Sequence, residues 1–161
     1  MHLTDEYDIV CSYPGFEVRL HSSSQQQGLF ATRSFSREER LIEFSIRSIL
    51  SSPTYLTVQI GENEHFEFEP DHLKYLNHSC DPNVFIDLEN LTLVAIKAIV
   101  TGDELRFFYP STEWKMDQPF DCQCGWSNCL GTIAGAQSLS GYQLAEYKLS
   151  PYIKQKLNLL N

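Results

Sequence analysis

The chain carries, at residues 74–83, the stretch Lys74-Tyr75-Leu76-Asn77-His78-Ser79-Cys80-Asp81-Pro82-Asn83. From Asn77 onward this stretch is rich in Asn, Ser, Asp and Pro, which is typical of a turn rather than of a helix or strand interior. Cys80 lies in that turn and offers a soft ligand for a metal ion. His78 has an ordinary alternative role as a histidine capped within the turn. The stretch is therefore a candidate site, whose nature depends on the other cysteines.

A second group of cysteines occurs in the order Cys122-Gln123-Cys124-Gly125-Trp126-Ser127-Asn128-Cys129. Three thiolates this close in sequence can bind one Zn²⁺ but leave one of its four tetrahedral positions unfilled. Cys80, Cys11, or a histidine such as His78 could supply the fourth ligand, and Cys80 is favoured because it lies in a polar turn. Four thiolates leave no open position, so such a zinc ion would be structural. The alternative is three unrelated buried cysteines.

The composition indicates one acidic domain with a basic partner. The 161 residues include twelve Lys and Arg against twenty-one Asp and Glu, a formal net charge of -9. Such a charge repels nucleic acid and anionic membranes and attracts basic partners, although it can also serve solubility alone. No window resembles a membrane span, and the first residues lack the basic and apolar regions of a signal peptide. We expect an intracellular protein, nuclear or cytoplasmic, without a disulfide framework, because its five cysteines are an odd number.

Short β-like segments, separated by Gly, Pro, Asn and Asp, follow one another through most of the chain. We expect strands at residues 9–10, 29–31, 41–44, 55–60, 65–68 and 91–100, and a surface loop at 22–28. Helices are predicted at 36–40, 70–76 and 140–149, and another begins at Ser150-Pro151, with serine as the cap. In that last helix Ile153, Leu157 and Leu160 fall on one face, which should pack on the core.

Four stretches occur in a fixed order along the chain: residues 28–35 with 41–44, residues 74–83, residues 102–109 and residues 122–129. Together they resemble the SET-domain methyltransferases. Residues 74–83 and 102–109 resemble the two signature motifs of that family, the earlier stretch is similar to its first motif, and the cysteine group resembles its post-SET motif. The resemblance runs from about residue 26 to residue 133.

The resemblance implies a fold that is mainly β, a β-rich α+β arrangement of several small sheets with a knot-like threading. In it, the segment 77–80 lies beside the strand that ends at Tyr109. The implied organisation is a SET domain with an N-terminal lead-in strand over residues 1–118, a zinc-binding post-SET segment over 119–133 and a C-terminal helical extension over 134–161.

The resemblance also implies a site for S-adenosylmethionine and a structural zinc site. Gly28 and Leu29, with the backbone around them, would cradle the cofactor. Asn77 would hold the amino acid end of the cofactor, and His78 would lie beside its adenine. The zinc ligands that the resemblance implies are Cys80, Cys122, Cys124 and Cys129.

Tyr109 is the residue that the resemblance places at the transfer site, where its hydroxyl would orient the methyl group through weak C–H···O contacts. A narrow aromatic channel would desolvate a lysine and lower the pKa of its amine. Tyr55, Phe107 and Trp114 are candidates for the channel wall, although each could equally be an ordinary core residue. Phe107 matches a position where phenylalanine is associated with di- or trimethylation.

The predicted function is methyl transfer to a lysine of a basic protein, with a histone tail as one candidate. Two departures from the family's pattern bear on it. Gln26 stands where glycine is common and could reshape the cofactor loop, and Phe108 stands where an aspartate or asparagine commonly precedes the final tyrosine. The alternatives are an enzyme of this fold that acts on a small molecule and a non-catalytic module that binds peptides.

Overall fold

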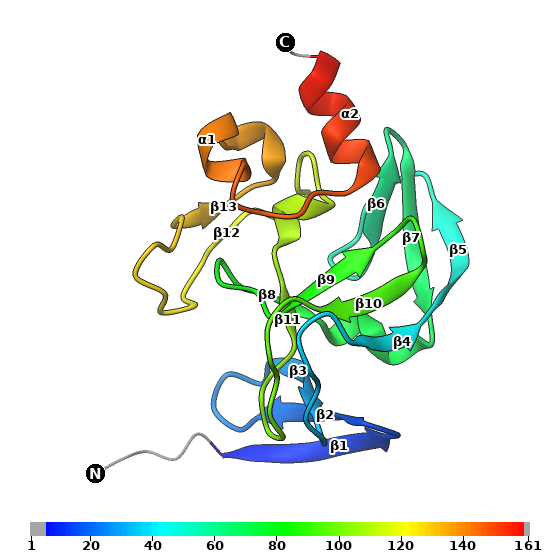
Figure 1. Cartoon of the computed structure of the whole chain (residues 1–161), viewed down its shortest axis with the longest axis vertical. Helices are drawn as coiled ribbons and strands as arrows, with labels where there is room; N and C mark the ends of the chain where they lie inside the picture. The colour runs from blue at the N-terminus through cyan, green and yellow to red at the C-terminus, as the bar shows by residue number, and fades with distance from the viewer. Residues whose placement is uncertain (1–5, 160–161) are drawn as a thin grey trace.

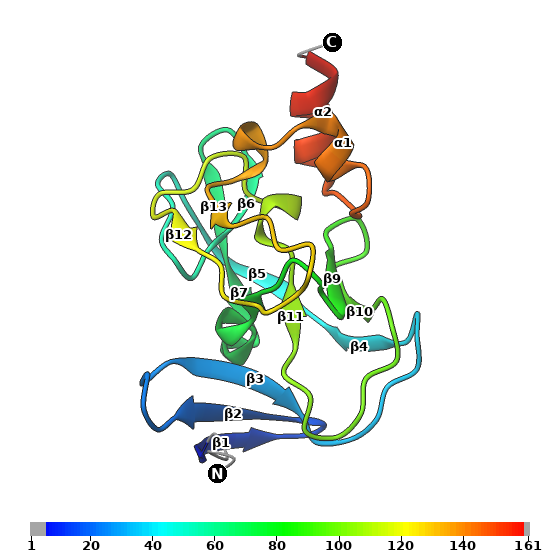
Figure 2. The ribbon, with the colours of Figure 1, turned by 90° about the vertical axis from the view of Figure 1, so that its left-hand side faces the viewer.

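The computed structural model describes residues 6–159 of the chain. These residues form five small sheets and short helices, with the first sheet at one end of the molecule and the α-helices at the other (Figure 1, Figure 2). The strands are β1 Tyr7–Tyr13, β2 Phe16–His21, β3 Gln27–Ala31, β4 Arg40–Glu43, β5 Ser45–Leu50, β6 Val58–Gly61, β7 Glu64–Glu69, β8 Asn77–His78, β9 Val84–Asp87, β10 Thr92–Ala95, β11 Arg106–Phe107, β12 Phe120–Asp121 and β13 Thr132–Ile133. The helices are η1 Asp71–Tyr75, η2 Tyr109–Ser111, η3 Ala136–Ser138, α1 Gly141–Leu144 and α2 Pro151–Leu159.

The sheets are small because turns interrupt the chain every few residues. Three sheets have the strand orders β1-β2-β3, β4-β10-β9 and β5-β7-β6, and two are the pairs β8–β11 and β12–β13. The prediction of a mainly β fold of several small sheets is confirmed, as is the lead-in strand, which is β1. Among the described helices, none has the length and apolar character needed to cross a membrane.

The parallel pair β8–β11 joins two segments that are far apart in the sequence, and Asn77 lies opposite Arg106 in it. The chain before β11 also runs along β3, because the Leu105 N–H donates a hydrogen bond to the Leu29 carbonyl at 2.8 Å. Asn83 ties the two motifs together, since its own N–H donates to the Arg106 carbonyl and its Oδ1 accepts from the Arg106 N–H. The segment 77–80 therefore lies beside the strand that leads to Tyr109, as predicted.

Buried apolar side chains form two clusters. The larger one fills the space between the three-stranded sheets and includes the fully buried Leu29 and Phe66. The smaller one lies under α2 and consists of Phe108, Trp114, Ala136, Leu144, Tyr152 and Ile153. The second cluster attaches the C-terminal helices to the chain that follows β11.

The C-terminal helices agree with the sequence in part. Helix α2 begins at Pro151 as predicted, and the Ser150 hydroxyl caps it by accepting a hydrogen bond from the Ile153 N–H at 3.3 Å. On the predicted apolar face Ile153 is fully buried and Leu157 is half-buried, whereas Leu160 lies outside the described residues. The predicted helix at 140–149 is wrong in length, because α1 ends at Leu144 and turns follow it.

The helix predicted at 36–40 is wrong. The Glu39 carboxylate accepts a hydrogen bond from the Ser36 N–H at 2.8 Å, and Glu38 adopts a φ of 71°, which no α-helix accommodates. Two strands are also shorter than predicted: β6 begins only at Val58, after a turn, and β10 ends at Ala95. The short helix predicted at 70–76 is present as η1.

Candidate functional site

An open pocket of about 820 Å³ lies between β3, the loop before β6, the pair β8–β11 and the chain around β12. This volume suits a cofactor-sized ligand. Six of the eight residues expected at the cofactor site, the transfer site and the channel line it, namely Gly28, Tyr55, Asn77, His78, Phe107 and Tyr109. The pocket thus collects residues from the first motif and from both signature motifs.

Two residues expected at this site do not line it. The Leu29 side chain is fully buried in the larger core cluster, because side chains alternate along β3. The Trp114 indole is 9% exposed and packs in the smaller cluster, under α2, so its assignment to the channel wall is not supported by its position. Tyr55, by contrast, is 78% exposed and stands at the rim of the pocket.

Asn77 is held in one orientation by its side-chain amide. Its Nδ2 donates hydrogen bonds of 2.8 Å to the Gln27 carbonyl and to Glu104 Oε1. Glu104 is itself held by Arg106, whose Nε donates to Glu104 Oε2 at 2.8 Å. No hydrogen bond to Asn77 Oδ1 occurs within residues 6–159, so this oxygen can accept one from a ligand.

Gly28 leaves room for this network. A Cβ built at position 28 would lie only 2.5 Å from Glu104 Oε1. Any side chain at this position would therefore displace the Glu104 carboxylate. The sequence had indicated a surface loop that includes Gly28, but Gly28 lies within β3. The glycine is needed for space, since its φ is not in the left-handed region.

His78 is a buried, neutral imidazole. Its Nδ1 accepts a hydrogen bond from the Tyr109 N–H at 3.1 Å, and its Nε2 lies 3.4 Å from Cys80 Sγ. Burial, with a smaller effect of the Arg106 charge, lowers the pKa of His78 to about 4. The ring therefore carries no charge near neutral pH and links the Tyr109 backbone to the cysteine group.

Tyr109 presents its ring and hydroxyl to the pocket. The hydroxyl donates a hydrogen bond of 3.0 Å to the Leu76 carbonyl. Burial raises the pKa of Tyr109 above its ordinary value, and the carboxyl groups of Glu104 and Glu113 raise it further, so the phenol stays protonated. Its ring centroid lies 4.8 Å from that of Phe107 and 5.9 Å from that of Phe120.

Among the pocket-lining residues that the sequence reasoning did not single out are Glu104, Phe120 and Glu113. Phe120 packs edge-on against both His78 and Tyr109. Alternation of side chains before Arg106 could have indicated Glu104, and the position of Phe120 just before the cysteine group could have indicated that ring. Nothing in the sequence pattern distinguishes Glu113.

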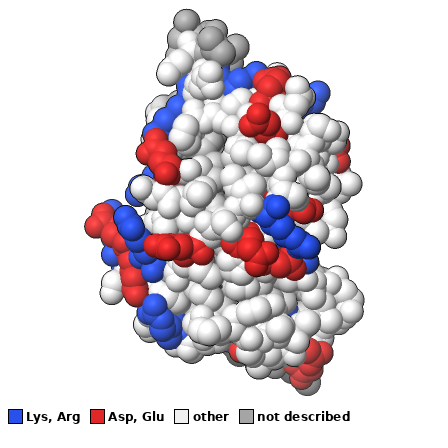
Figure 3. Space-filling model, turned by 90° about the vertical axis from the view of Figure 1, so that its right-hand side faces the viewer, with Lys and Arg blue, Asp and Glu red and all other residues white. Residues whose placement is uncertain are grey.

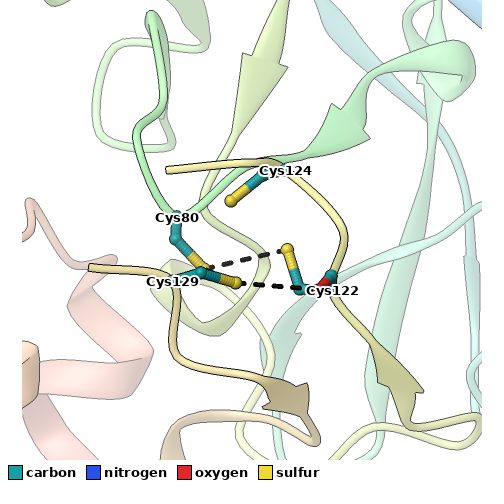
Figure 4. A group of neighbouring side chains, drawn as sticks. All are labelled: Cys80, Cys122, Cys124 and Cys129. Carbon is teal, nitrogen blue, oxygen red and sulfur yellow. Dashed lines mark hydrogen bonds between the residues drawn. The ribbon is translucent and has the colours of Figure 1, made fainter. Parts of the chain in front are cut away.

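The four cysteines of the predicted metal site converge on one small space (Figure 4). Their sulfur atoms all lie within 4.8 Å of one another, and Cys80 Sγ is 3.9 Å from both Cys122 Sγ and Cys129 Sγ. A tetrahedral zinc ion with ordinary Zn–S bonds separates its sulfur ligands by about 3.8 Å. The side chains therefore fit a tetrathiolate zinc site. Cys11, the other cysteine considered as a fourth ligand, is exposed in β1.

Without a cation, burial keeps at least two of these thiols protonated. Burial raises the pKa of Cys80 well above its ordinary value and that of Cys122 to about 11. For Cys124, burial acts in the same direction, but hydrogen bonds from the Trp126 and Cys80 backbone outweigh it and lower its pKa to about 7. Thiols of this kind become thiolates together only when a cation compensates their charge.

The two departures from the family's pattern have clear positions. Gln26 lines the pocket beside the cofactor loop. Phe108 is buried and its ring stacks on Tyr147 at 3.6 Å, where Tyr147 also donates a hydrogen bond of 2.7 Å to the Cys80 carbonyl. Phe108 therefore anchors the C-terminal segment instead of presenting a polar group to the pocket.

A family model described as the SET domain matches residues 26–110. Methyltransferase flvH of Aspergillus flavus is 45% identical over 106 residues, covering 65% of this chain and 59% of that protein. Histone-lysine N-methyltransferase, H3 lysine-36 specific, of Chaetomium globosum is 38% identical over 68 residues, covering 38% of this chain and 8% of that protein. The chain thus spans 59% of the length of the first relative and much less of the second.

Solved structures share the fold. KRYPTONITE in complex with mCHG DNA and SAH superposes with a TM-score of 0.55 at 18% identity, covering 73% of this chain and 29% of that one. The methyltransferase domain of human histone-lysine N-methyltransferase SETMAR superposes with a TM-score of 0.52 at 18% identity, covering 74% of this chain and 58% of that one.

Proposed function

The chain belongs to the SET-domain family of methyltransferases, and from this premise we propose that it methylates the side-chain amine of a lysine in a basic protein. A histone tail is one candidate substrate. The observation that carries the proposal is that Asn77, His78 and Tyr109 line a single pocket of suitable volume. S-Adenosylmethionine supplies an activated methyl group on a sulfonium, so the protein's tasks are to bind it, align the amine and keep the amine uncharged.

The cofactor would lie along Gly28, Asn77 and His78. Asn77 Oδ1 would accept hydrogen bonds from the amino group of the cofactor, because both Nδ2 hydrogens are already engaged by Gln27 and Glu104. The missing side chain at Gly28 leaves room for the Glu104 carboxylate, which holds the Asn77 amide. The neutral ring of His78 would provide a flat, uncharged surface for the adenine.

The amine would enter between aromatic side chains and meet the methyl group beside Tyr109. Phe107 and Phe120 flank the ring of Tyr109, and Tyr55 stands at the rim of the pocket. Apolar walls desolvate the ammonium group and so favour the free amine that attacks the methyl carbon. Phe107 offers no hydroxyl that could hold the amine in one orientation, which supports di- or trimethyl-lysine as product.

Three parts of the chain share this work in the proposed organisation. Residues 1–118 build the pocket, residues 119–133 close it through the zinc-bound cysteines, and residues 134–161 hold that segment from outside. The last role is supported by Leu130, which packs on the cluster that contains Leu144 and Ile153, and by Tyr147, which bonds to the carbonyl of Cys80. The zinc ion is structural in this scheme, because four thiolates fill its coordination.

A basic substrate is supported by the net charge of -9. On the face shown in Figure 3, acidic and basic side chains lie beside one another, and much of the rest of that face is uncharged. That face therefore offers no continuous acidic surface. The pocket is lined by the carboxyl groups of Glu104, Glu113, Asp117 and Asp121 and by the basic side chains of Lys74, Arg106 and Lys115. The same charge disfavours direct binding to nucleic acid, and we propose a nuclear or cytoplasmic location.

The test is incubation of the purified protein with labelled S-adenosylmethionine and a panel of histones, lysine peptides and small amines. Label on a protein lysine that disappears in Tyr109→Phe supports the proposal. Label on small amines alone would identify the protein as a small-molecule methyltransferase. Cofactor binding without transfer to any acceptor would identify a non-catalytic binding module.

A further inference from the structure

Glu113 is a carboxyl group in the pocket that the proposed cofactor and metal sites do not use. It is partly buried, and its Oε2 accepts hydrogen bonds from the Thr112 hydroxyl at 2.6 Å and from the Gln59 N–H at 3.1 Å. Within residues 6–159, no hydrogen bond reaches Oε1, and no Lys or Arg forms an ion pair with this carboxyl group. One of its oxygen atoms is thus free to contact a ligand in the pocket.

The position of Glu113 is fixed relative to the transfer site. Its N–H donates a hydrogen bond of 3.0 Å to the Tyr109 carbonyl, so it stands one turn beyond that tyrosine. Its carbonyl accepts from the Ala136 N–H at 2.8 Å, and the next N–H, of Trp114, donates to Gln59 Oε1 at 2.9 Å. The carboxyl group is also close enough to raise the pKa of Tyr109.

The charges around Glu113 leave it without a compensating cation. The other charged or titratable groups that line the pocket include Lys74, Glu104, Arg106, Tyr109, Lys115 and Asp117, and on α2 the Tyr152 hydroxyl bonds to Glu62. Arg106 is paired with Glu104 and Lys74 with Asp71, and within residues 6–159 Lys115 forms no ion pair with Glu113. Burial therefore raises the pKa of Glu113 to about 7. A carboxyl group of this kind both attracts an ammonium ion and can accept a proton from it.

We propose that the Glu113 carboxylate binds the ammonium form of the acceptor and takes its proton before methyl transfer. The proton leaves the ammonium nitrogen and bonds to a Glu113 oxygen, giving a neutral amine and a carboxylic acid. The amine lone pair then forms the nitrogen–carbon bond while the carbon–sulfur bond breaks, and the product leaves as a methylammonium ion. Glu113 returns its proton to water. This inference rests on the proposed function, since it identifies the group that selects a cationic amine.

The experiment compares the wild type with Glu113→Gln, Glu113→Asp and the exposed control Glu89→Gln, using the best acceptor from the panel. We expect Glu113→Gln to raise the acceptor KM or lower kcat/KM by about tenfold to a hundredfold, the size expected for a lost hydrogen bond to a charged group. Cofactor affinity should stay within about twofold, Glu113→Asp should recover part of the loss, and the acidic limb of the pH profile should disappear in Glu113→Gln.

A second measurement uses the wild type alone, in case Glu113→Gln folds poorly. Calorimetric binding of the acceptor to the protein saturated with S-adenosylhomocysteine, repeated in two buffers of different ionisation enthalpy, counts the protons exchanged. Proton exchange that varies with pH near neutrality supports the inference, and none at any pH overturns it. If the wild type methylates the acceptor and Glu113→Gln keeps the same kcat/KM and pH profile, the inference alone is overturned. If the wild type methylates no amine, the proposed function is overturned as well.

Discussion

The ring of Phe120 lies 5.9 Å from the ring of Tyr109, at an angle of 75°. Phe120 also lies 5.7 Å from His78 and begins β12, which pairs with β13 and leads directly to Cys122. An aromatic wall of the site is therefore positioned by the segment that carries the cysteines. Whatever holds the cysteines together also holds this ring against Tyr109.

Removal of zinc should abolish methyl transfer before it unfolds the protein. The larger core cluster contains no residue of the segment 119–133, so the sheets keep their packing when that segment loosens. We expect about one zinc ion per chain in the wild type and loss of both zinc and activity in Cys80→Ser. Metal analysis, activity and far-ultraviolet circular dichroism check this, with Cys11→Ser as control because Cys11 is exposed in β1. Full zinc content in Cys80→Ser would refute the four-cysteine site.

Tyr109→Phe should lower kcat more than it weakens binding. The lost hydroxyl bonds to the Leu76 carbonyl and lies at the proposed transfer site, so cofactor contacts at Asn77 and Gly28 remain. We expect kcat to fall on the order of a hundredfold, as when one preorganised polar group is removed from an active site. Cofactor affinity, measured by calorimetry, should change by less than about twofold. The exposed Tyr142→Phe is the control, and an unchanged kcat in Tyr109→Phe would remove this tyrosine from the mechanism.

Gly28→Ala should weaken cofactor binding through Glu104. The new Cβ would displace Glu104 Oε1, which holds the Asn77 amide, so the orientation of Asn77 Oδ1 would change. We expect the dissociation constant for the cofactor to rise at least about tenfold, the cost of one misplaced hydrogen bond to a charged group. The control is Gly141→Ala, because a Cβ at position 141 contacts nothing within 4 Å. Equal affinities in the two variants would contradict the role of Gly28.

The grouping of the four cysteines could be predicted because it depends on the number of ligands that a tetrahedral zinc ion requires. Three cysteines at 122–129 leave one tetrahedral position, and the structure brings Cys80 to them. Positions that depend on tertiary packing could not be read in this way. Trp114 looks like any other aromatic residue in sequence, and only its contacts with the C-terminal helices place it away from the pocket. Glu113 belongs to no motif, and its environment is created by Gln59, a residue 54 positions earlier.

Local polar bonds explain the errors in secondary structure. The segment 36–40 consists of residues that tolerate a helix, but the Glu39 carboxylate bonds to the Ser36 N–H and Glu38 turns the chain. Two of the strands that pattern reading overlooked, β2 and β5, lie beside turns, and in β5 most side chains are exposed. Such strands exist because β3 and β7 pair with them, which is information that a short window of sequence does not contain.

The stability of the protein should fall as the pH rises from about 4.5 to 7, through Glu113. The folded state keeps the Glu113 proton up to a pKa of about 7, whereas the unfolded chain loses it above the ordinary value of 4.5. Folding therefore takes up a proton in this window, and the free energy of unfolding decreases with pH. Glu113→Gln should remove this slope and be more stable than the wild type above pH 7, by up to about 3 kcal/mol. Denaturant titrations across the window check this, with Glu89→Gln as control. An unchanged slope in Glu113→Gln would assign the pH dependence to other groups.

Phe107→Tyr should shift the product toward monomethyl-lysine. The Phe107 ring is 6% exposed and lies 4.8 Å from Tyr109, so a hydroxyl added to it would enter the aromatic site and not the solvent. A hydroxyl there can hydrogen-bond the amine, directly or through a water molecule, and stop the rotation that a second transfer requires. Mass spectrometry of the product over time measures the ratio of methylation states. Phe85→Tyr, on β9 and outside the pocket, is the control and should leave the ratio unchanged. The first transfer needs no rotation of the amine, so its rate should change little. A slower first transfer with an unaltered ratio of methylation states would show that Phe107 only packs against Tyr109.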